Sequence, residues 1–107
     1  MRRGTTHDFE IILDDVDLTS LAAMWVSFAQ FGKVLVNKEL DDVTIDGQTI
    51  TVHLTQTDTL KFRPRAKVWI QIRGLTNSGA AWATDPFKRR VEDILKDGAI
   101  SAGNGQP

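Results

Sequence analysis

Short runs of alternating residues, separated by turn-forming residues, constrain the fold of this 107-residue chain more than any other feature. In the run 66–75, Val68, Ile70 and Ile72 alternate with polar residues and with Trp69, as in a strand that buries one face. Similar runs recur about every 8–12 residues, and no long helical period is present. This pattern predicts an all-β fold, an immunoglobulin-like β-sandwich of about seven strands.

Turn and cap signals lie between the predicted strands. Phe31-Gly32 and Asp46-Gly47 have the composition of tight hairpin turns, because glycine takes the positive φ that such turns need. Thr55 and Asp58 have the spacing of a capping box, which predicts one short helical turn near 55–60. The two hairpin turns fix how the strands around them pair.

The chain has no Pro/Gly-rich linker that would divide it into two domains. Its last residues, ISAGNGQP, have the composition of a frayed terminus. We therefore expect a single β-sandwich domain over residues 1–98 and a flexible C-terminal tail over residues 99–107.

One face of the predicted strands is strongly apolar and supplies the core. The residues expected to face inward are Phe9, Ile11, Met24, Val26, Phe28, Ile50, Val52, Leu54, Val68, Ile70 and Ile72. A chain of this length buries only a modest core. Because it contains no cysteine and hence no disulfide, we expect its stability to depend on that core or on self-association.

The composition argues against several classes of protein. A net charge of -1 gives no strong field for nucleic acid or anionic membranes, and the lack of cysteine excludes thiolate catalysis and cysteine-based zinc sites. No apolar run approaches the roughly 20 residues of a membrane span. The start, MRRGTTHDFEI, lacks the apolar segment of a secretory signal, so we expect the protein to be made and initially retained in a cytoplasm.

Residues suited to catalysis or metal binding are few. The two histidines, His7 and His53, have no second ligand at metal spacing, and we expect both to be surface imidazoles. The acidic run DDVD lacks the glycine and the distal glutamate of a calcium loop, which favours roles in turns and caps. No glycine-rich phosphate loop is present. We predict no catalytic residue, no cofactor, no metal site and no enzyme activity.

Basic residues gather at Arg2-Arg3, around Pro64 and at 88–90, where they are able to contact phosphates. Fourteen acidic residues balance them, however, and few aromatic residues interleave with them as stacking on single strands requires. A solvated basic surface is the favoured interpretation, and nucleic acid is disfavoured as a partner.

The three tryptophans are the residues that bear most on function. Strand parity places Trp69 on one face with Arg73, away from the aliphatic set, and places Trp25 with Ser27. The face of Trp82 depends on the turn in TNSG. An even-length loop places Trp82 on the Trp69 face, and an odd-length loop turns it toward the aliphatic face.

Neighbouring strands extend the predicted tryptophan face. A two-residue turn at Phe31-Gly32 brings Val34 and Val36 onto it, and a Greek-key sandwich places the 22–31 strand beside the 66–75 strand. One tryptophan at such a position is as consistent with the core as with the surface. Several together form an apolar patch of the kind that marks an interface. The predicted interface residues are Trp25, Trp69, Trp82, Arg73, Val34 and Val36.

Four phrases of the sequence resemble a known family. They are MRRGTT, AQFGKVLVNKELDDVTIDGQTITVHLTQTDTLKF, QIRGLTNSG and VEDILKDG. Over residues 1–98 the chain resembles small uncharacterised proteins from prophages of gut Firmicutes. The resemblance implies an all-β phage protein encoded near structural or tail-module genes, with no enzyme activity and no established site residues. The chain departs from the family at His7, where the family has proline, and at Phe31, where it has asparagine.

These observations together predict a non-enzymatic phage or prophage structural or assembly protein, associated with a tail or baseplate, that acts through a Trp-rich sheet face. The expected partner is a second copy of the chain or another phage structural protein, and no membrane is involved. We expect the protein in the host cytoplasm during synthesis and then in the virion.

Two other functions stay open. A carbohydrate-binding module for host attachment would use the indoles as a glycan platform, with Gln71 and Asn37 facing sugar hydroxyls. A small nucleic-acid-associated regulator would use Arg63, Arg89 and Arg90.

Overall fold

A computed structural model of the chain describes residues 1–93, 95 and 98–100. The predicted tail, residues 99–107, therefore lies mostly outside the described residues. The elements in chain order are β1 (His7–Ile12), η1 (Leu18–Ser20), β2 (Leu21–Gln30), β3 (Lys33–Glu39), η2 (Leu40–Asp42), β4 (Val43–Asp46), β5 (Thr49–Leu54), α1 (Gln56–Leu60), β6 (Lys67–Thr76), β7 (Ala81–Ala83) and β8 (Phe87–Arg90).

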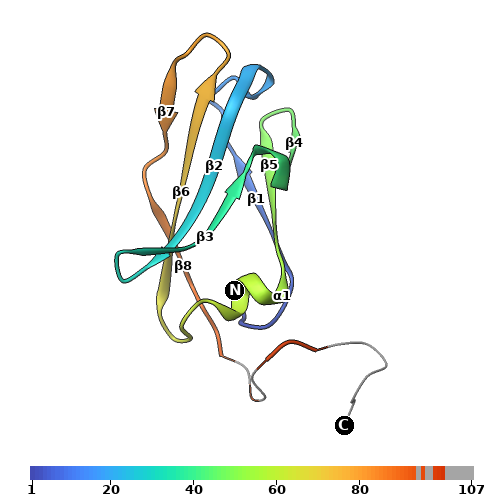
Figure 1. Ribbon diagram of the computed structural model, residues 1–107, viewed down its shortest axis with the longest axis vertical. Coiled ribbons are helices and arrows are strands. Elements are labelled where there is room, and N and C mark those ends of the chain that lie inside the picture. Colours follow the sequence, from blue (N-terminus) through green and yellow to red (C-terminus); the bar gives the residue numbers. More distant parts are fainter. Residues whose placement is uncertain (94, 96–97, 101–107) are drawn as a thin grey trace.

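The strands form two antiparallel sheets (Figure 1). The smaller sheet has the order β1-β5-β4, and the larger has the order β3-β2-β6-β7, with β8 also paired to β6. The predominantly β fold with one lone α-helix, α1, agrees with the prediction at that level. The strands β2 and β6, each ten residues long, lie side by side in the larger sheet, as the sequence analysis expected of the 22–31 and 66–75 strands.

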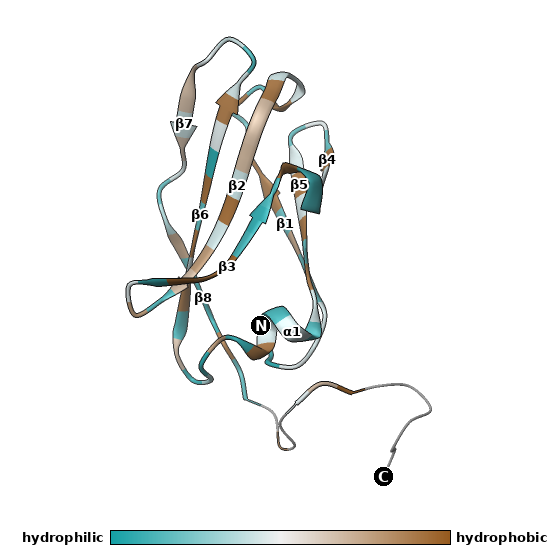
Figure 2. Cartoon of the chain, viewed as in Figure 1, coloured by the Kyte–Doolittle hydropathy of each residue, from teal (hydrophilic) through white to brown (hydrophobic). Residues whose placement is uncertain are grey.

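The core lies between the two sheets and is built mainly from the predicted inward set. Ten of the eleven predicted residues are buried, and Ile11 is partly buried against them. Phe28 lies at its centre, with its ring 5.9 Å from that of Phe9 and 6.0 Å from that of Phe62. Brown and teal segments alternate along β6 in Figure 2, which is the pattern that a sheet with one buried face requires, whereas β2 is brown to pale along most of its length. The prediction missed Leu18, Val36, Phe62 and Val91.

The predicted hairpin turns are present. Phe31 and Gly32 have φ values of 52° and 76°, as a two-residue turn with both central residues in the left-handed region requires. Phe31 pays a steric cost there that asparagine or glycine avoids. Its side chain is 74% exposed and lies under the Arg63 guanidinium, 5.4 Å from the ring centroid.

One edge of the larger sheet is shared by β7 and β8, which pair with opposite halves of β6. Pro86, between them, has no amide hydrogen to donate to a ladder. At this gap the Thr84 hydroxyl accepts a hydrogen bond from the Ile72 amide at 3.1 Å, and the Thr84 amide donates to the Ile72 carbonyl at 2.9 Å. The interrupted edge therefore stays attached to β6, and β8 lies beside Trp69.

The capping box predicted at the start of α1 is present. The Thr55 hydroxyl accepts from the Asp58 amide at 3.1 Å, and the Asp58 carboxylate accepts from the Thr55 amide at 2.9 Å. The Asp58 carboxylate also forms an ion pair with Lys38, whose Nζ lies 2.7 Å from Asp58 Oδ2. The side chains of Lys38 and Asp58 are only 16% and 12% exposed. Burial raises the pKa of Asp58, but hydrogen bonds from Lys38 and Thr55 outweigh it and leave that pKa below its ordinary value.

We predict that Asp58→Asn lowers the free energy of unfolding by about 2–3 kcal/mol, because it leaves Lys38 partly buried without its counter-ion. Since the pKa of Asp58 is lower in the folded state, this contribution is present above the unfolded pKa and is lost as pH falls through the folded pKa. Urea unfolding at pH 7 and below about pH 4 measures both effects.

The matched control is Glu92→Gln, which removes the more exposed ion pair between Arg90 and Glu92. We expect it to change stability by less than about 0.5 kcal/mol. Equal losses in the two variants would contradict the assigned role of Asp58.

Candidate functional site

The outer face of the larger sheet carries the residues singled out from the sequence. Trp25 on β2 lies opposite Arg73 on β6, and Ala29 on β2 lies opposite Trp69 on β6. Both indoles point away from the core, with exposures of 44% for Trp25 and 45% for Trp69. The two residues are on adjacent strands and offset by four positions, so their Cα atoms are about 14 Å apart. The strand parity predicted for both tryptophans is confirmed.

Each exposed indole has a cation over its ring. The Arg73 guanidinium lies 5.9 Å from the Trp25 ring, and Lys88 Nζ lies 5.2 Å from the Trp69 ring. Arg73 and Lys88 are the cross-strand neighbours of the two tryptophans in the sheet register. Exposed cation–π contacts of this kind contribute about 0.5–1 kcal/mol each. They place positive charge directly beside apolar area.

A polar strip crosses the face between the two indoles. Ser27 donates from its hydroxyl to Asn37 Oδ1 at 2.7 Å, and Gln71 Nε2 donates to the Thr84 carbonyl at 2.9 Å. Ser27 lies directly opposite both Asn37 and Gln71 in the sheet. The polar row therefore separates two rows that each combine an indole with a charged neighbour, Trp25 with Arg73 and Trp69 with Lys88.

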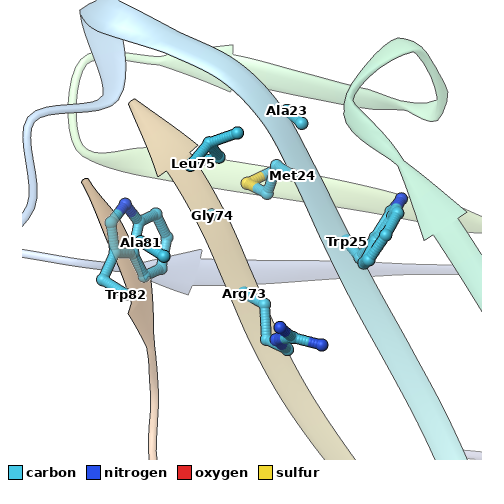
Figure 3. A pocket seen from close by; sticks show the side chains of 8 residues that line it. All are labelled: Ala23, Met24, Trp25, Arg73, Gly74, Leu75, Ala81 and Trp82. Carbon is cyan, nitrogen blue, oxygen red and sulfur yellow. The ribbon is translucent and has the colours of Figure 1, made fainter. Parts of the chain in front are cut away.

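Two shallow hollows flank this strip. One, of about 200 Å³, lies at the β7 end beside Trp25, and Figure 3 shows that its lining comes from β2, β6 and β7. The other, of about 400 Å³, lies beside Trp69 and is bordered by Val34 and Gln71. In the part of the chain that the structure describes, neither hollow has a histidine or a carboxylate in its lining, whereas a third, beside Trp25, is lined by Glu39 and Asp41. Shallow, largely apolar surfaces of this kind are suited to contact with a partner.

The prediction that Val36 lies on this outer face is wrong. A bulge in the β2–β3 pairing places Val34 opposite Ala29 and Val36 opposite Phe28, so that Leu35 is the extra residue. The bulge turns Val36 inward, where it is 4% exposed, and leaves Val34 outward, where it is 55% exposed. The parity rule fails here because it assumes an unbroken ladder.

The structure also corrects the placement of Trp82. The β6–β7 hairpin has a loop of odd length, residues 77–79, since the Thr76 amide bonds to the Ala80 carbonyl at 2.8 Å. Trp82 is thereby paired with Gly74 on the inner side of the sheet and packs against the core. Its Nε1 is buried with no hydrogen-bond partner. Trp82 therefore has a packing role and does not belong to the outer face.

His53 is exposed on its strand, as the sequence predicted, whereas His7 is partly buried. The ring of His7 meets that of Phe9 edge-on at 4.4 Å, and burial, followed by the positive N-terminus, lowers the pKa of His7. His53 lies on the outer face of the smaller sheet, where Nδ1 is 2.8 Å from Asp8 and Nε2 is 3.2 Å from Thr44. Among the described residues, no group of three or more His, Asp or Glu side chains is placed to hold a metal ion.

Much of the basic cluster makes contacts within the chain. Arg3 donates to the carbonyls of Phe62 and Leu60 at 2.8 and 3.1 Å, near the end of α1. Arg65 pairs with Asp93 at 2.9 Å, and Arg90 pairs with Glu92 at 3.0 Å. These contacts attach both termini to the sandwich and leave fewer guanidinium groups for phosphates.

Two outer-face residues escaped the sequence reasoning. Lys88 appeared only as part of a basic run, because nothing in the sequence shows that β8 pairs beside Trp69. Leu75, which is 39% exposed, has the same strand parity as Trp69 and Arg73, and that signal was available in the sequence. We use the name indole face for the outer-face residues Trp25, Trp69, Arg73, Leu75, Lys88 and Val34.

Comparisons with protein-family models, curated proteins and solved structures yield no match for this chain. Within the described residues, no helix has both the length and the apolar character that crossing a membrane demands.

Proposed function

We propose that this chain is a non-enzymatic binding protein that contributes to the assembly of a phage or prophage structure through its indole face. One observation carries the proposal. Trp25 and Trp69 stay nearly half exposed on the two longest strands of the fold, although the core is complete without them. Hydration of the apolar surface of an exposed indole is unfavourable, and contact with another surface removes that surface from water.

A protein partner suits the composition of the face. Tryptophan and arginine are the side chains that most often dominate protein–protein binding energy, and here Arg73 already lies beside Trp25. Leu75 and Val34 add apolar area around the two indoles. We infer that a second copy of the chain or another phage structural protein covers this face.

The biological setting rests on the resemblance to prophage proteins, and a tail or baseplate is the preferred place. We propose the host cytoplasm during synthesis and then the virion as its locations. The immunoglobulin-like arrangement of about seven strands is likewise part of this proposal. Two antiparallel sheets that enclose one core, with β2 beside β6, support it.

Light scattering of the wild type and of Trp69→Ser tests the proposal. We expect the wild type to associate at concentrations up to about 1 mM and Trp69→Ser to associate about tenfold more weakly, because the substitution removes a central aromatic anchor. The matched control is Phe31→Ser, which removes an even more exposed aromatic side chain, at the β2–β3 turn. Association unchanged in Trp69→Ser, or weakened equally in Phe31→Ser, would contradict the use of this face.

A glycan-binding module is the second candidate, favoured by the hollow in which Ser27 and Gln71 lie beside Trp69. Sugar rings stack on exposed indoles while amide and hydroxyl groups bind their hydroxyls. Titration with cell-wall glycans should then quench or shift the tryptophan fluorescence of the wild type and not that of Trp69→Ser. The absence of any change with every glycan would remove this candidate.

A nucleic-acid role has less support, because Arg90 pairs with Glu92, while Arg63 and Arg89 lie over the aromatic rings of Phe31 and Phe87. A mobility shift at low salt that disappears as salt rises would support it.

A further inference from the structure

The two sheets of the sandwich carry opposite charge on their outer faces. Strands β1, β4 and β5 of the smaller sheet contain no lysine or arginine. Their outward positions hold Asp8, Glu10 and Asp46, all exposed, together with His53. The aspartates at 14, 15 and 17 follow β1, and those at 41 and 42 precede β4. This surface, the acidic face, therefore carries its carboxylates on the two edge strands, β1 and β4, while the outward residues of the central strand β5 are Thr49, Thr51 and His53.

The outer face of the larger sheet has the opposite balance. Lys67, Arg73, Lys88 and Arg90 point outward there, against Glu39 on the same face and Asp41, which lines a hollow with Glu39 and Trp25. Within the described part of the chain, Lys67, Arg73 and Lys88 form no ion pair, whereas Arg90 is paired with Glu92. The cations surround the two exposed indoles. A chain with a net charge of only -1 is thus strongly polarised between its two faces.

We propose that copies of this chain associate head to tail, with the indole face of one copy seated on the acidic face of the next. The inference rests on the proposed function and names the surface that covers the indoles. Opposite potentials across a contact favour binding and specify its orientation. Pairing two indole faces would instead bring the same set of lysines and arginines against itself, which charge repulsion disfavours.

The acidic face also offers apolar area for the indoles. Ile12 is 66% exposed at its edge, and Thr44, Thr49 and Thr51 occupy outward positions on the same face as the carboxylates. Threonine methyl groups and an aliphatic edge suit flat indole rings, while Asp8 and Glu10 suit Arg73 and Lys88. The two faces are therefore complementary in both charge and polarity.

The geometry favours an open stack of copies. Because the sheets pack by their inner faces, the indole face and the acidic face point in opposite directions, and a heterologous contact between such faces does not close after two copies. The smaller sheet is about 14 Å wide and about 20 Å long, so each contact is small. We expect dissociation constants in the micromolar range or weaker, with a mass that keeps rising with concentration.

Sedimentation velocity on charge-reversed variants tests the inference. Lys88→Glu alters the indole face, and Glu10→Lys alters the acidic face. We expect each variant alone to associate about tenfold more weakly than the wild type, and a 1:1 mixture to associate again, because each supplies the intact face that the other lacks. The matched control for Lys88→Glu is Lys61→Glu, at the end of α1, which makes the same change in net charge outside both faces.

The outcomes separate this inference from the proposed function. If Lys88→Glu and Trp69→Ser weaken association while Glu10→Lys does not, the indole face binds something other than the acidic face, and only the head-to-tail inference fails. If Trp69→Ser associates like the wild type, the proposed function fails as well. A wild type that stays monomeric up to about 1 mM, or that associates equally well at about 500 mM salt, overturns the inference.

Discussion

Gly74→Ala should destabilise the fold by about 2–4 kcal/mol, a large share of the stability of a domain this size. A Cβ added at position 74 would lie 2.8 Å from Nε1 of Trp82 and closer still to Cζ2 and Cε2 of the same ring. The indole covers the glycine across the β6–β7 pair, so either the ring or the strand has to move. Thermal unfolding followed by circular dichroism should show a midpoint lowered by about 10–20 °C.

The paired variant Gly74→Ala with Trp82→Leu provides the control. Leucine lacks the ring atoms that meet the new Cβ, so we expect the double variant to be more stable than the sum of the two single losses predicts. Additive losses would show that the cost at position 74 has another origin. A Gly74→Ala protein as stable as the wild type would contradict the packing of Trp82 against β6.

Trp25→Ser combined with Trp69→Ser should abolish association while leaving the fold intact. Removing both indoles takes away the two largest exposed side chains of the indole face, and we expect association to weaken by about a hundredfold or more. Both rings lie on the outside, so the free energy of unfolding should fall by only about 1–2 kcal/mol, mainly from the two lost cation–π contacts. Sedimentation velocity and urea unfolding on the same samples measure the two quantities separately.

A matched comparison uses Trp82→Ser, which removes the third indole from the inner side of the same sheet. That variant should lose stability in the range of a core truncation, about 3–5 kcal/mol. If the outer double variant unfolds as easily as Trp82→Ser, the assignment of Trp25 and Trp69 to a binding surface is wrong.

Strand parity predicted much of this fold from the sequence. The alternation in β2, β5 and β6 placed the core residues and both exposed tryptophans correctly, since a period of two leaves only two possible faces. The capping box at Thr55 and Asp58 and the turn at Phe31-Gly32 were also identified, because each depends only on neighbouring residues. The local structure that such residues favour is found in the folded protein when the tertiary contacts are consistent with it.

The errors arose where one residue changes the register. The bulge at Leu35 reversed the face of Val36, and the odd loop at residues 77–79 decided the face of Trp82. Neither is determined by local composition, since a single inserted residue exchanges the two faces of a strand. The pairing of β8 beside Trp69, and the separation of charge between the two sheets, depend on topology and were not predictable from spacing. The prophage assignment depends on resemblance alone and stays a prediction.

Hydroxyl-radical footprinting of the three tryptophans, read by mass spectrometry at increasing protein concentration, tests the central claim most directly. We expect Trp25 and Trp69 to oxidise readily in dilute protein and to become protected together as copies associate. The oxidation rate of Trp82 should be lower and should not change with concentration. Oxidation of Trp25 and Trp69 at rates independent of concentration, in samples that sedimentation shows to be associated, would contradict the claim that this face is the one that binds.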